Sequence, residues 1–242
     1  MDSVKDYVNL VNEPWGKMFY DLLFMQLNVP NEPKLSILDF GSGLGVTSNH
    51  FAAWHDVTAV EPNSEMIENR YTENDYAQVH GGVEKLSAYK AKSFDVIICH
   101  NVLEYIENKE PILMELMRVL KTGGFLSVIK HNRVGRVFKT AVFDNDPGKA
   151  ITLLEKGSND RNKYLGTQYI YSNDDLELWG NKYGGKVVNI LGLRAFYALG
   201  QDNSIKYTDE WYENMLLLER KVEAIDDYKN AAFHSHVFIE KV

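Results

Sequence analysis

The chain has 242 residues, of which 45% are hydrophobic and 25% are charged, with a formal net charge of −8. No stretch reaches the roughly 18 apolar residues of a membrane-spanning helix. The acidic balance repels nucleic acid on average, so a nucleic-acid partner would need a local basic surface. A single cysteine, Cys99, excludes an intramolecular disulfide and a cysteine-based metal site. With no leader-like start, these features predict a cytoplasmic protein without membrane or DNA partners.

The first elements are predicted to be two helices within residues 3–29. Apolar residues recur there at helical spacing, and Pro14 interrupts the pattern, which places a break at residues 12–16. Residues 28–34 contain two prolines and read as a linker. We therefore expect residues 1–34 to form an N-terminal helical cap.

A glycine-rich turn follows the first predicted strand, residues 35–38. Gly41, Gly43 and Gly45 occupy alternate positions, and a helix-compatible segment comes next. Glycine has no Cβ and tolerates positive φ, so the backbone of such a turn can approach a ligand closely. The helix N-terminus then offers unpaired N–H groups to a polar ligand. A tight turn without a ligand is the alternative interpretation.

An acidic residue ends the second predicted strand, residues 57–60. Glu61 lies 20 residues beyond Gly41, where nucleotide-binding α/β folds place the acid that accepts hydrogen bonds from ribose hydroxyls. The glycine pattern is G-x-G-x-G rather than the dinucleotide fingerprint G-x-G-x-x-G. The stretches LDFGSGLG and VTAVEPNSEMIE resemble the first and second motifs of class I S-adenosylmethionine-dependent methyltransferases. This resemblance implies S-adenosylmethionine as the cofactor.

Strand and helix patterns alternate along the rest of the chain. Further strands are expected near residues 76–80, 94–100, 125–129, 187–193 and 231–239, and helices near 63–71, 111–120, 172–183 and 211–225. Alternation indicates parallel strands joined by right-handed crossovers. The resemblance adds a Rossmann-like α/β fold with a seven-stranded, mostly parallel sheet and helices on both faces. In that fold the last strand runs antiparallel beside the fifth, within a single domain of residues 1–242.

Within the class, the chain resembles the bacterial tRNA methyltransferases that esterify the carboxylate of wobble uridine-oxyacetic acid. The stretches that carry this resemblance are CHNVLEYI, VIKHNRVGRVFK and GLRAFYALG. The resemblance implies an anionic acceptor and a tRNA partner. A small-molecule acceptor remains an alternative because the chain is acidic, and a cofactor-binding protein without transferase activity is a third interpretation.

The resemblance also implies positions for cofactor contacts. Glycine at position 82 departs from the acid that many members have near there for the adenine amine. Lys17 stands near the place of an arginine that meets the cofactor carboxylate in the tRNA-modifying family. The expected cofactor-binding residues are Lys17, Gly41, Ser42, Gly43, Gly45, Glu61, Met66, Val83, Glu84 and His100.

Residues after the fifth and sixth strands are expected to bind the acceptor, because ligands of such sheets bind beyond the carboxyl ends of the strands. Residues 130–139 carry four positive charges and no acid, and they begin a predicted irregular insertion, residues 130–171, on the substrate side. Arg194 is the leading candidate, since guanidinium holds a carboxylate by paired hydrogen bonds. The expected acceptor-binding residues are Asn132, Arg133, Arg194 and Tyr197.

No catalytic side chain is assigned from the sequence. A carboxylate acceptor is already ionised at neutral pH and needs no general base. A phenol, hydroxyl or amine acceptor would need one, and His100 or His131 would be the candidates. His234 and His236 share one face of the last strand without an acidic cluster, so we interpret them as core or surface residues and expect no metal. The residues Trp211, Met215, Leu218, Val222 and Ile225 are expected to form the packed face of a long helix.

Overall fold

The computed structural model describes residues 3–156, 161–162 and 166–242. The chain divides into two compact units. Unit 1 comprises residues 1–28, 129–170 and 190–236, and unit 2 comprises residues 29–128, 171–189 and 237–242. Strands β5, β8 and β9 have residues in both units. Each unit is described by itself below.

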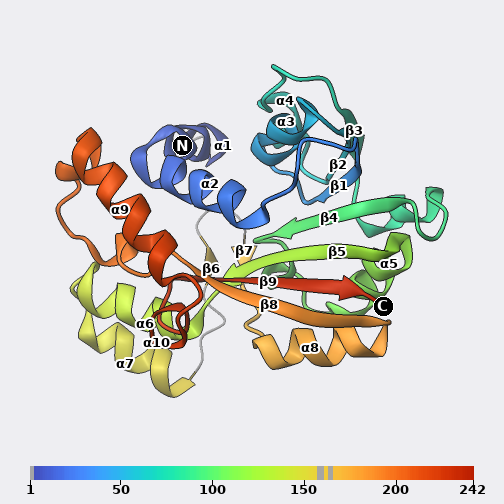
Figure 1. The fold of residues 1–242 in the computed structure, drawn as a ribbon. Coiled ribbons are helices and arrows are strands. Elements are labelled where there is room, and N and C mark those ends of the chain that lie inside the picture. The colour runs from blue at the N-terminus through green and yellow to red at the C-terminus, as the bar shows by residue number, and fades with distance from the viewer. Residues whose placement is uncertain (1–2, 157–160, 163–165) are drawn as a thin grey trace. The chain divides into compact units, whose positions relative to one another are not determined.

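A seven-stranded sheet with the order β3-β2-β1-β4-β5-β9-β8 is the central element (Figure 1). β1 pairs in parallel with β2 and β4, and β2 pairs in parallel with β3. β9 runs opposite to β5, which confirms the predicted antiparallel last strand. The strands are β1 (Ser36–Phe40), β2 (Asp56–Glu61), β3 (Ala77–His80), β4 (Phe94–His100), β5 (Leu120–His131), β8 (Gly185–Leu193) and β9 (His234–Lys241). A separate antiparallel pair is formed by β6 (Arg161–Asn162) and β7 (Gly166–Thr167).

The central strands are buried on both faces, as their continuous apolar runs predict. Ile37 and Leu38 of β1 and Ile97 of β4 have no exposed surface. Cys99 is fully buried in the same strand, and burial raises the pKa of its thiol. The cysteine is therefore a core residue.

Two helices of unit 2, α4 and α8, begin at capping signals of the sequence. Asn63 Oδ1 accepts the backbone N–H groups of Glu65 and Met66 at 2.9 and 3.3 Å. Ser172 and Asp175 form a reciprocal capping box. The helical elements are α3 (Val46–Ala52), α4 (Ser64–Glu68), η1 (Val83–Ala88), η2 (Leu103–Tyr105), α5 (Glu110–Val119) and α8 (Asn173–Lys182).

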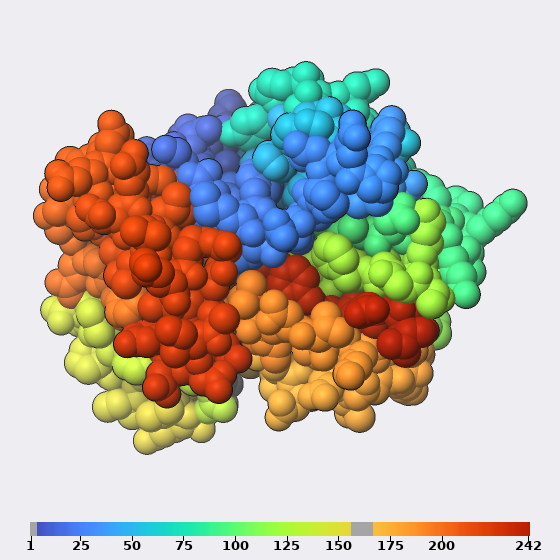
Figure 2. Space-filling view, viewed as in Figure 1, coloured from blue at the N-terminus to red at the C-terminus, as the bar shows by residue number. Residues whose placement is uncertain are grey.

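Unit 1 is mainly helical, and its N-terminal pair breaks at Glu13 as Pro14 predicts. The helical elements of this unit are α1 (Ser3–Asn12), α2 (Pro14–Leu27), α6 (Arg133–Val142), α7 (Pro147–Lys156), η3 (Tyr197–Leu199), η4 (Ile205–Tyr207), α9 (Asp209–Val222) and α10 (Asp226–Lys229). In the space-filling view, the yellow atoms of α7 form part of the surface of the drawn face (Figure 2).

Three expectations about local structure are wrong in whole or in part. The segment expected to be irregular contains the helices α6 and α7, because Asn132 caps the first of them. β5 begins at Leu120 and ends at His131, so it is longer than the strand expected near residues 125–129. The buried residues of α9 are Tyr212, Glu219 and Val222, so the expected packed face is confirmed at Val222 but wrong at Leu218, which is 39% exposed.

Across the residues that the structure describes, no helix combines the length and the apolar character needed to cross a lipid bilayer.

Candidate cofactor and acceptor sites

The glycine turn of unit 2 has the conformation for which glycine is needed. Gly41, Gly43 and Gly45 all have positive φ, at 77°, 54° and 69°. A Cβ at Gly41 would lie 2.2 Å from a methyl group of Val102, so this glycine lets the turn pack against the segment after β4. A Cβ at Gly43 would meet nothing within 4 Å, so the turn is open at that point.

Glu61 is bound to the same turn. Its Oε2 accepts the backbone N–H of Gly43 at 2.8 Å, and its Oε1 accepts that of Asn63 at 2.9 Å. A carboxylate has about four acceptor positions, so each oxygen can still accept a further hydrogen bond. The side chain is 7% exposed. Glu61 therefore both shapes the turn and can accept hydrogen bonds from a pair of ligand hydroxyls.

Asp39, near the end of β1, forms a hydrogen bond that stabilises the turn. The hydroxyl of Ser48, on α3, donates to Asp39 Oδ2 at 2.6 Å, which ties the helix after the turn to the strand before it. Burial raises the pKa of Asp39 to about 6, the Ser48 hydrogen bond opposes this rise, and the charge of Glu61 adds to it.

The end of β4 supplies polar atoms beside the glycine turn. His100 Nε2 lies 2.7 Å from the hydroxyl of Ser127 on β5. Burial lowers the pKa of His100 to about 3, so its imidazole is neutral at neutral pH. Asn101 has φ 55°, and neither its Oδ1 nor the Oγ of Ser42, both buried, has a hydrogen-bond partner among the described residues. Buried polar atoms without partners are rare, and they indicate a place for a polar ligand.

Asn101 is a candidate that the sequence analysis missed. The available signal was its position directly after the fourth strand, together with the tolerance of asparagine for the left-handed region. Met66, which the sequence analysis included, is 5% exposed on α4 and contributes apolar packing.

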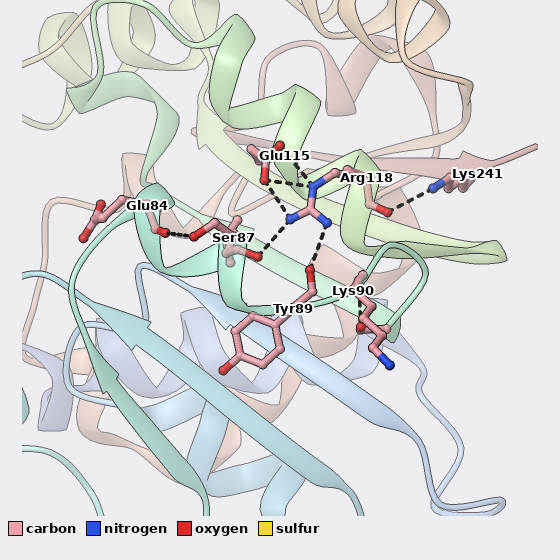
Figure 3. A network of polar contacts seen from close by, with 9 residues as sticks. Glu84, Ser87, Tyr89, Lys90, Glu115, Arg118 and Lys241 are labelled. Carbon is pink, nitrogen blue, oxygen red and sulfur yellow. Dashed lines mark hydrogen bonds and ion pairs between the residues drawn. The ribbon is translucent and has the colours of Figure 1, made fainter.

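A polar network holds the segment with Val83 and Glu84 against α5 (Figure 3). Arg118 pairs with Glu115 at 2.8 Å and donates to the carbonyls of Leu86 and Tyr89, both at 2.9 Å. The Glu84 carboxylate accepts the Gly82 N–H at 2.8 Å, which lowers the pKa of Glu84. The carboxylate is therefore engaged with its own loop, and its contact with adenine stays a prediction.

Lys17 belongs to unit 1, on α2. Its side chain is exposed, and its Nζ lies 4.3 Å from the centre of the Tyr212 ring. The expected contact of Lys17 with the cofactor carboxylate stays a prediction.

Arg194 is a buried cation of unit 1 that lies among aromatic rings. Its side chain is buried, and its guanidinium lies 5.4–5.7 Å from the ring centres of Trp15, Phe19 and Phe233. Its one hydrogen bond among the described residues is a long one, 3.5 Å, from Nη1 to the Trp15 carbonyl, and its Nε has no partner. Burial lowers the pKa of Arg194 to about 10, which leaves it charged at neutral pH. A buried cation of this kind is costly unless an anion pairs with it.

Two further buried groups of unit 1 are electrostatically coupled to Arg194. The hydroxyl of Tyr197 and Nδ1 of His234 have no hydrogen-bond partner among the described residues. Burial is the main cause of two pKa changes: the pKa of Tyr197 is raised to about 12, and that of His234 falls well below its usual value. Tyr197 is one of the acceptor-binding residues expected from the sequence, whereas His234 is expected there as a core or surface residue.

The other two acceptor-site candidates have structural partners. The Asn132 side chain accepts the Val134 N–H at 3.2 Å, which caps α6, and donates to the Asn230 carbonyl at 2.8 Å. Arg133 is exposed and donates to the Leu154 carbonyl at 2.6 Å. These contacts give both residues a role in holding α6, and their contact with an acceptor stays a prediction.

Comparisons with known proteins agree with this geometry. Residues 38–128 match a family described as methyltransferase domain. A tRNA 5-carboxymethoxyuridine methyltransferase of Escherichia coli O157:H7 is 24% identical over 216 residues, which cover 86% of this chain and 80% of that protein. A ubiquinone biosynthesis O-methyltransferase of Nitrosococcus oceani is 31% identical over 140 residues, or 56% of this chain and 55% of that protein.

Solved structures of S-adenosylmethionine-dependent methyltransferases share this fold. The crystal structure of an S-adenosylmethionine-dependent methyltransferase from Thermotoga maritima superposes with a TM-score of 0.64 and 17% identity, and the match covers 99% of this chain and 96% of that one. The matching domain contains the glycine turn, Glu61 and the polar end of β4. The chain is therefore an S-adenosylmethionine-dependent methyltransferase with the class I fold.

Proposed function

We propose that the protein methylates an acceptor that carries a carboxylate, and that this acceptor is a 5-carboxymethoxyuridine nucleotide of tRNA. The observation that carries the proposal is the buried guanidinium of Arg194, with which no carboxylate of the described residues forms an ion pair. An arginine in that state matches a ligand carboxylate, which accepts two parallel N–H bonds. The relative of E. coli named for 5-carboxymethoxyuridine shares similarity over most of both chains.

The residues of unit 2 fit the cofactor. Glu61 can accept from the ribose hydroxyls, and the open turn at Gly43 admits the methionine part. Ser42 and Asn101 offer buried polar atoms to its charged groups. When bound, the sulfonium supplies an activated methyl group to a carboxylate oxygen, while the electron pair of the broken carbon–sulfur bond stays on sulfur.

The protein's own contribution to such a reaction is orientation. A carboxylate is ionised at neutral pH, so no side chain has to remove a proton. Arg194 would hold the carboxylate in one plane, and the Tyr197 hydroxyl and His234 would add hydrogen bonds. Orienting two reactants can be worth ~7–11 kcal/mol of the barrier. The neutral state of His100 adds no positive charge beside the positively charged cofactor.

A small-molecule carboxylate is the second candidate acceptor. The net charge of −8 favours it over a polyanion. The basic segment of residues 130–139 is also partly neutralised, because Lys139 pairs with Asp144 at 2.7 Å.

Mass spectrometry of tRNA nucleosides tests the proposal. Cells that lack the gene should accumulate 5-carboxymethoxyuridine and lose its methyl ester, and the purified protein with S-adenosylmethionine should restore the ester on tRNA from those cells. Unchanged nucleosides in the deletion strain, with no transfer to that tRNA in vitro, would contradict the tRNA acceptor and leave the small-molecule candidate.

A further inference from the structure

Glu219 is a buried carboxylate on α9 that pairs with backbone instead of with a cation. It is 2% exposed. Its Oε2 accepts the N–H of Ala195 at 2.7 Å, and its Oε1 accepts those of Phe196 and Tyr197 at 2.9 and 2.8 Å. Among the described residues it forms no ion pair. One side chain thus binds three consecutive N–H groups of the loop after β8.

The conformation of that loop has to be stabilised by contacts with residues outside the loop. Arg194, which precedes the three N–H groups, has φ 61°, in the left-handed region that bulky residues rarely adopt. Such a conformation persists only where its surroundings enforce it. Without the Glu219 carboxylate, three N–H donors in a largely buried loop would lose their acceptor, which is a strongly unfavourable state. The conformation of the loop therefore depends on Glu219.

The same loop carries the groups that we assign to the acceptor carboxylate, Arg194 and Tyr197. The charge of Glu219 stabilises the Arg194 guanidinium electrostatically. Because the carboxylate oxygens accept backbone N–H groups, Glu219 does this without occupying the guanidinium donors. Lys206 holds the far end of the loop, since its Nζ donates to the Gly200 carbonyl at 2.8 Å and lies 4.7 Å from the centre of the Tyr197 ring.

We propose that Glu219 is the positioning residue of the acceptor site: it holds residues 195–197 so that Arg194 and Tyr197 keep their polar groups available for the acceptor. The inference rests on the proposed function, because it concerns binding of that acceptor and not of the cofactor. It assigns a role in catalysis to a residue of α9 that touches neither the acceptor nor the cofactor.

The test compares Glu219→Gln with Glu213→Gln, an exposed carboxylate on the same helix. Glutamine preserves size but replaces one acceptor oxygen by an NH2 group that faces a backbone N–H. In Glu219→Gln, hydrogen exchange at the amides of residues 195–197 should be at least tenfold faster. KM for tRNA that bears 5-carboxymethoxyuridine should rise at least tenfold, with S-adenosylmethionine affinity within twofold of the natural protein. Glu213→Gln should change none of these quantities.

The Arg194→Ala background separates this inference from the proposed function. If Glu219 acts through Arg194 and its loop, Glu219→Gln should change KM less than threefold once Arg194 is absent. A KM effect of undiminished size in that background, or unchanged amide exchange in the single variant, would overturn the positioning role. If Arg194→Ala itself leaves KM unchanged while Glu219→Gln accelerates exchange, the assigned anion anchor fails, and with it the role of Glu219 in acceptor binding.

A loss of folding would appear separately, as a lower midpoint of thermal unfolding. Glu219→Asp serves as the second variant, because it retains both oxygens on a shorter side chain. Recovery of KM towards the natural value in Glu219→Asp, at a similar unfolding midpoint to Glu219→Gln, is the expected result. Equal KM defects in both variants, in proportion to their loss of stability, would show a purely structural residue and would overturn the inference.

Discussion

Glu61 accepts the backbone N–H of Gly43 at 2.8 Å, so a hydrogen bond links the acid at the end of β2 to the glycine turn after β1. The two features that the sequence places 18 residues apart thus depend on each other. If a cofactor binds at this turn, a change at Glu61 would weaken its binding in two ways, through lost acceptor oxygens and through a loosened turn.

Substitution of Glu61 by glutamine should weaken S-adenosylmethionine binding by about 10–100-fold, or about 1.5–3 kcal/mol, because hydrogen bonds to a charged acceptor are lost. Isothermal titration calorimetry measures this. Glu65→Gln, at an exposed position on α4, is the matched control and should bind normally. Equal affinity in the two variants would show that Glu61 is not a cofactor ligand.

Gly41 and Gly43 offer a comparison between two alanine substitutions. Both have positive φ, but only a Cβ at Gly41 would collide with Val102, at 2.2 Å. Gly41→Ala should therefore lower the free energy of unfolding by about 1–3 kcal/mol more than Gly43→Ala, as overpacking does. Chemical denaturation measures the difference, and Val102→Ala should restore part of the stability of Gly41→Ala. Equal losses, with no restoration, would contradict the packing argument.

The raised pKa of Asp39, about 6, predicts a pH-dependent stability. Between pH 4 and 6 the folded protein binds more protons at this carboxyl than the unfolded chain does, so its contribution to stability falls as pH rises. Asp39→Asn removes the titration and can still accept the Ser48 hydrogen bond. The free energy of unfolding of this variant, relative to the natural protein, should grow by up to about 3 kcal/mol from pH 4 to pH 7.

Urea denaturation at several pH values, without cofactor, measures the difference in free energy of unfolding between Asp39→Asn and the natural protein. Asp56→Asn, whose side chain is 71% exposed, is the control and should show a small and nearly constant difference. A constant difference for Asp39→Asn would mean that the carboxyl titrates near its ordinary pKa.

Arg194→Lys should impair methyl transfer by about 10–1000-fold in kcat/KM while cofactor affinity changes little. Lysine retains the charge but cannot form the paired hydrogen bonds of a guanidinium, and a lost pair of charge-assisted bonds is worth roughly 1.5–4 kcal/mol. Transfer of labelled methyl groups to a verified acceptor measures this effect. Full activity would place the anion elsewhere or show that the acceptor is not an anion.

The glycine turn, the acid at the end of β2 and the buried strands of unit 2 could be predicted from the sequence, because their signals are local. The spacing of three glycines, the acid at the next strand end and the apolar runs of β1 and β4 each depend on a few neighbouring residues. Asn101 was missed because its isolated amide has no pattern, and only the folded chain shows that its Oδ1 is buried without a partner.

The acceptor side was less predictable, because its features join residues far apart in the chain. The apolar pattern of α9 predicted Leu218 as a packed residue, whereas the helix buries Glu219 against the N–H groups of residues 195–197. The capping of α6 by the Asn132 side chain was likewise not predicted, and the contact of this residue with an acceptor stays a prediction.

By itself the sequence determined the alternation of strands and helices and the glycine turn, since periodicity and spacing act within a few tens of residues, and its resemblance to class I methyltransferases gave the fold and the cofactor. Tertiary structure decided which polar groups lack partners, such as those of Arg194 and His234, and which acid holds the loop. Whether a polar group is satisfied depends on every neighbour that the fold brings within about 3 Å of it, and those neighbours come from distant parts of the chain.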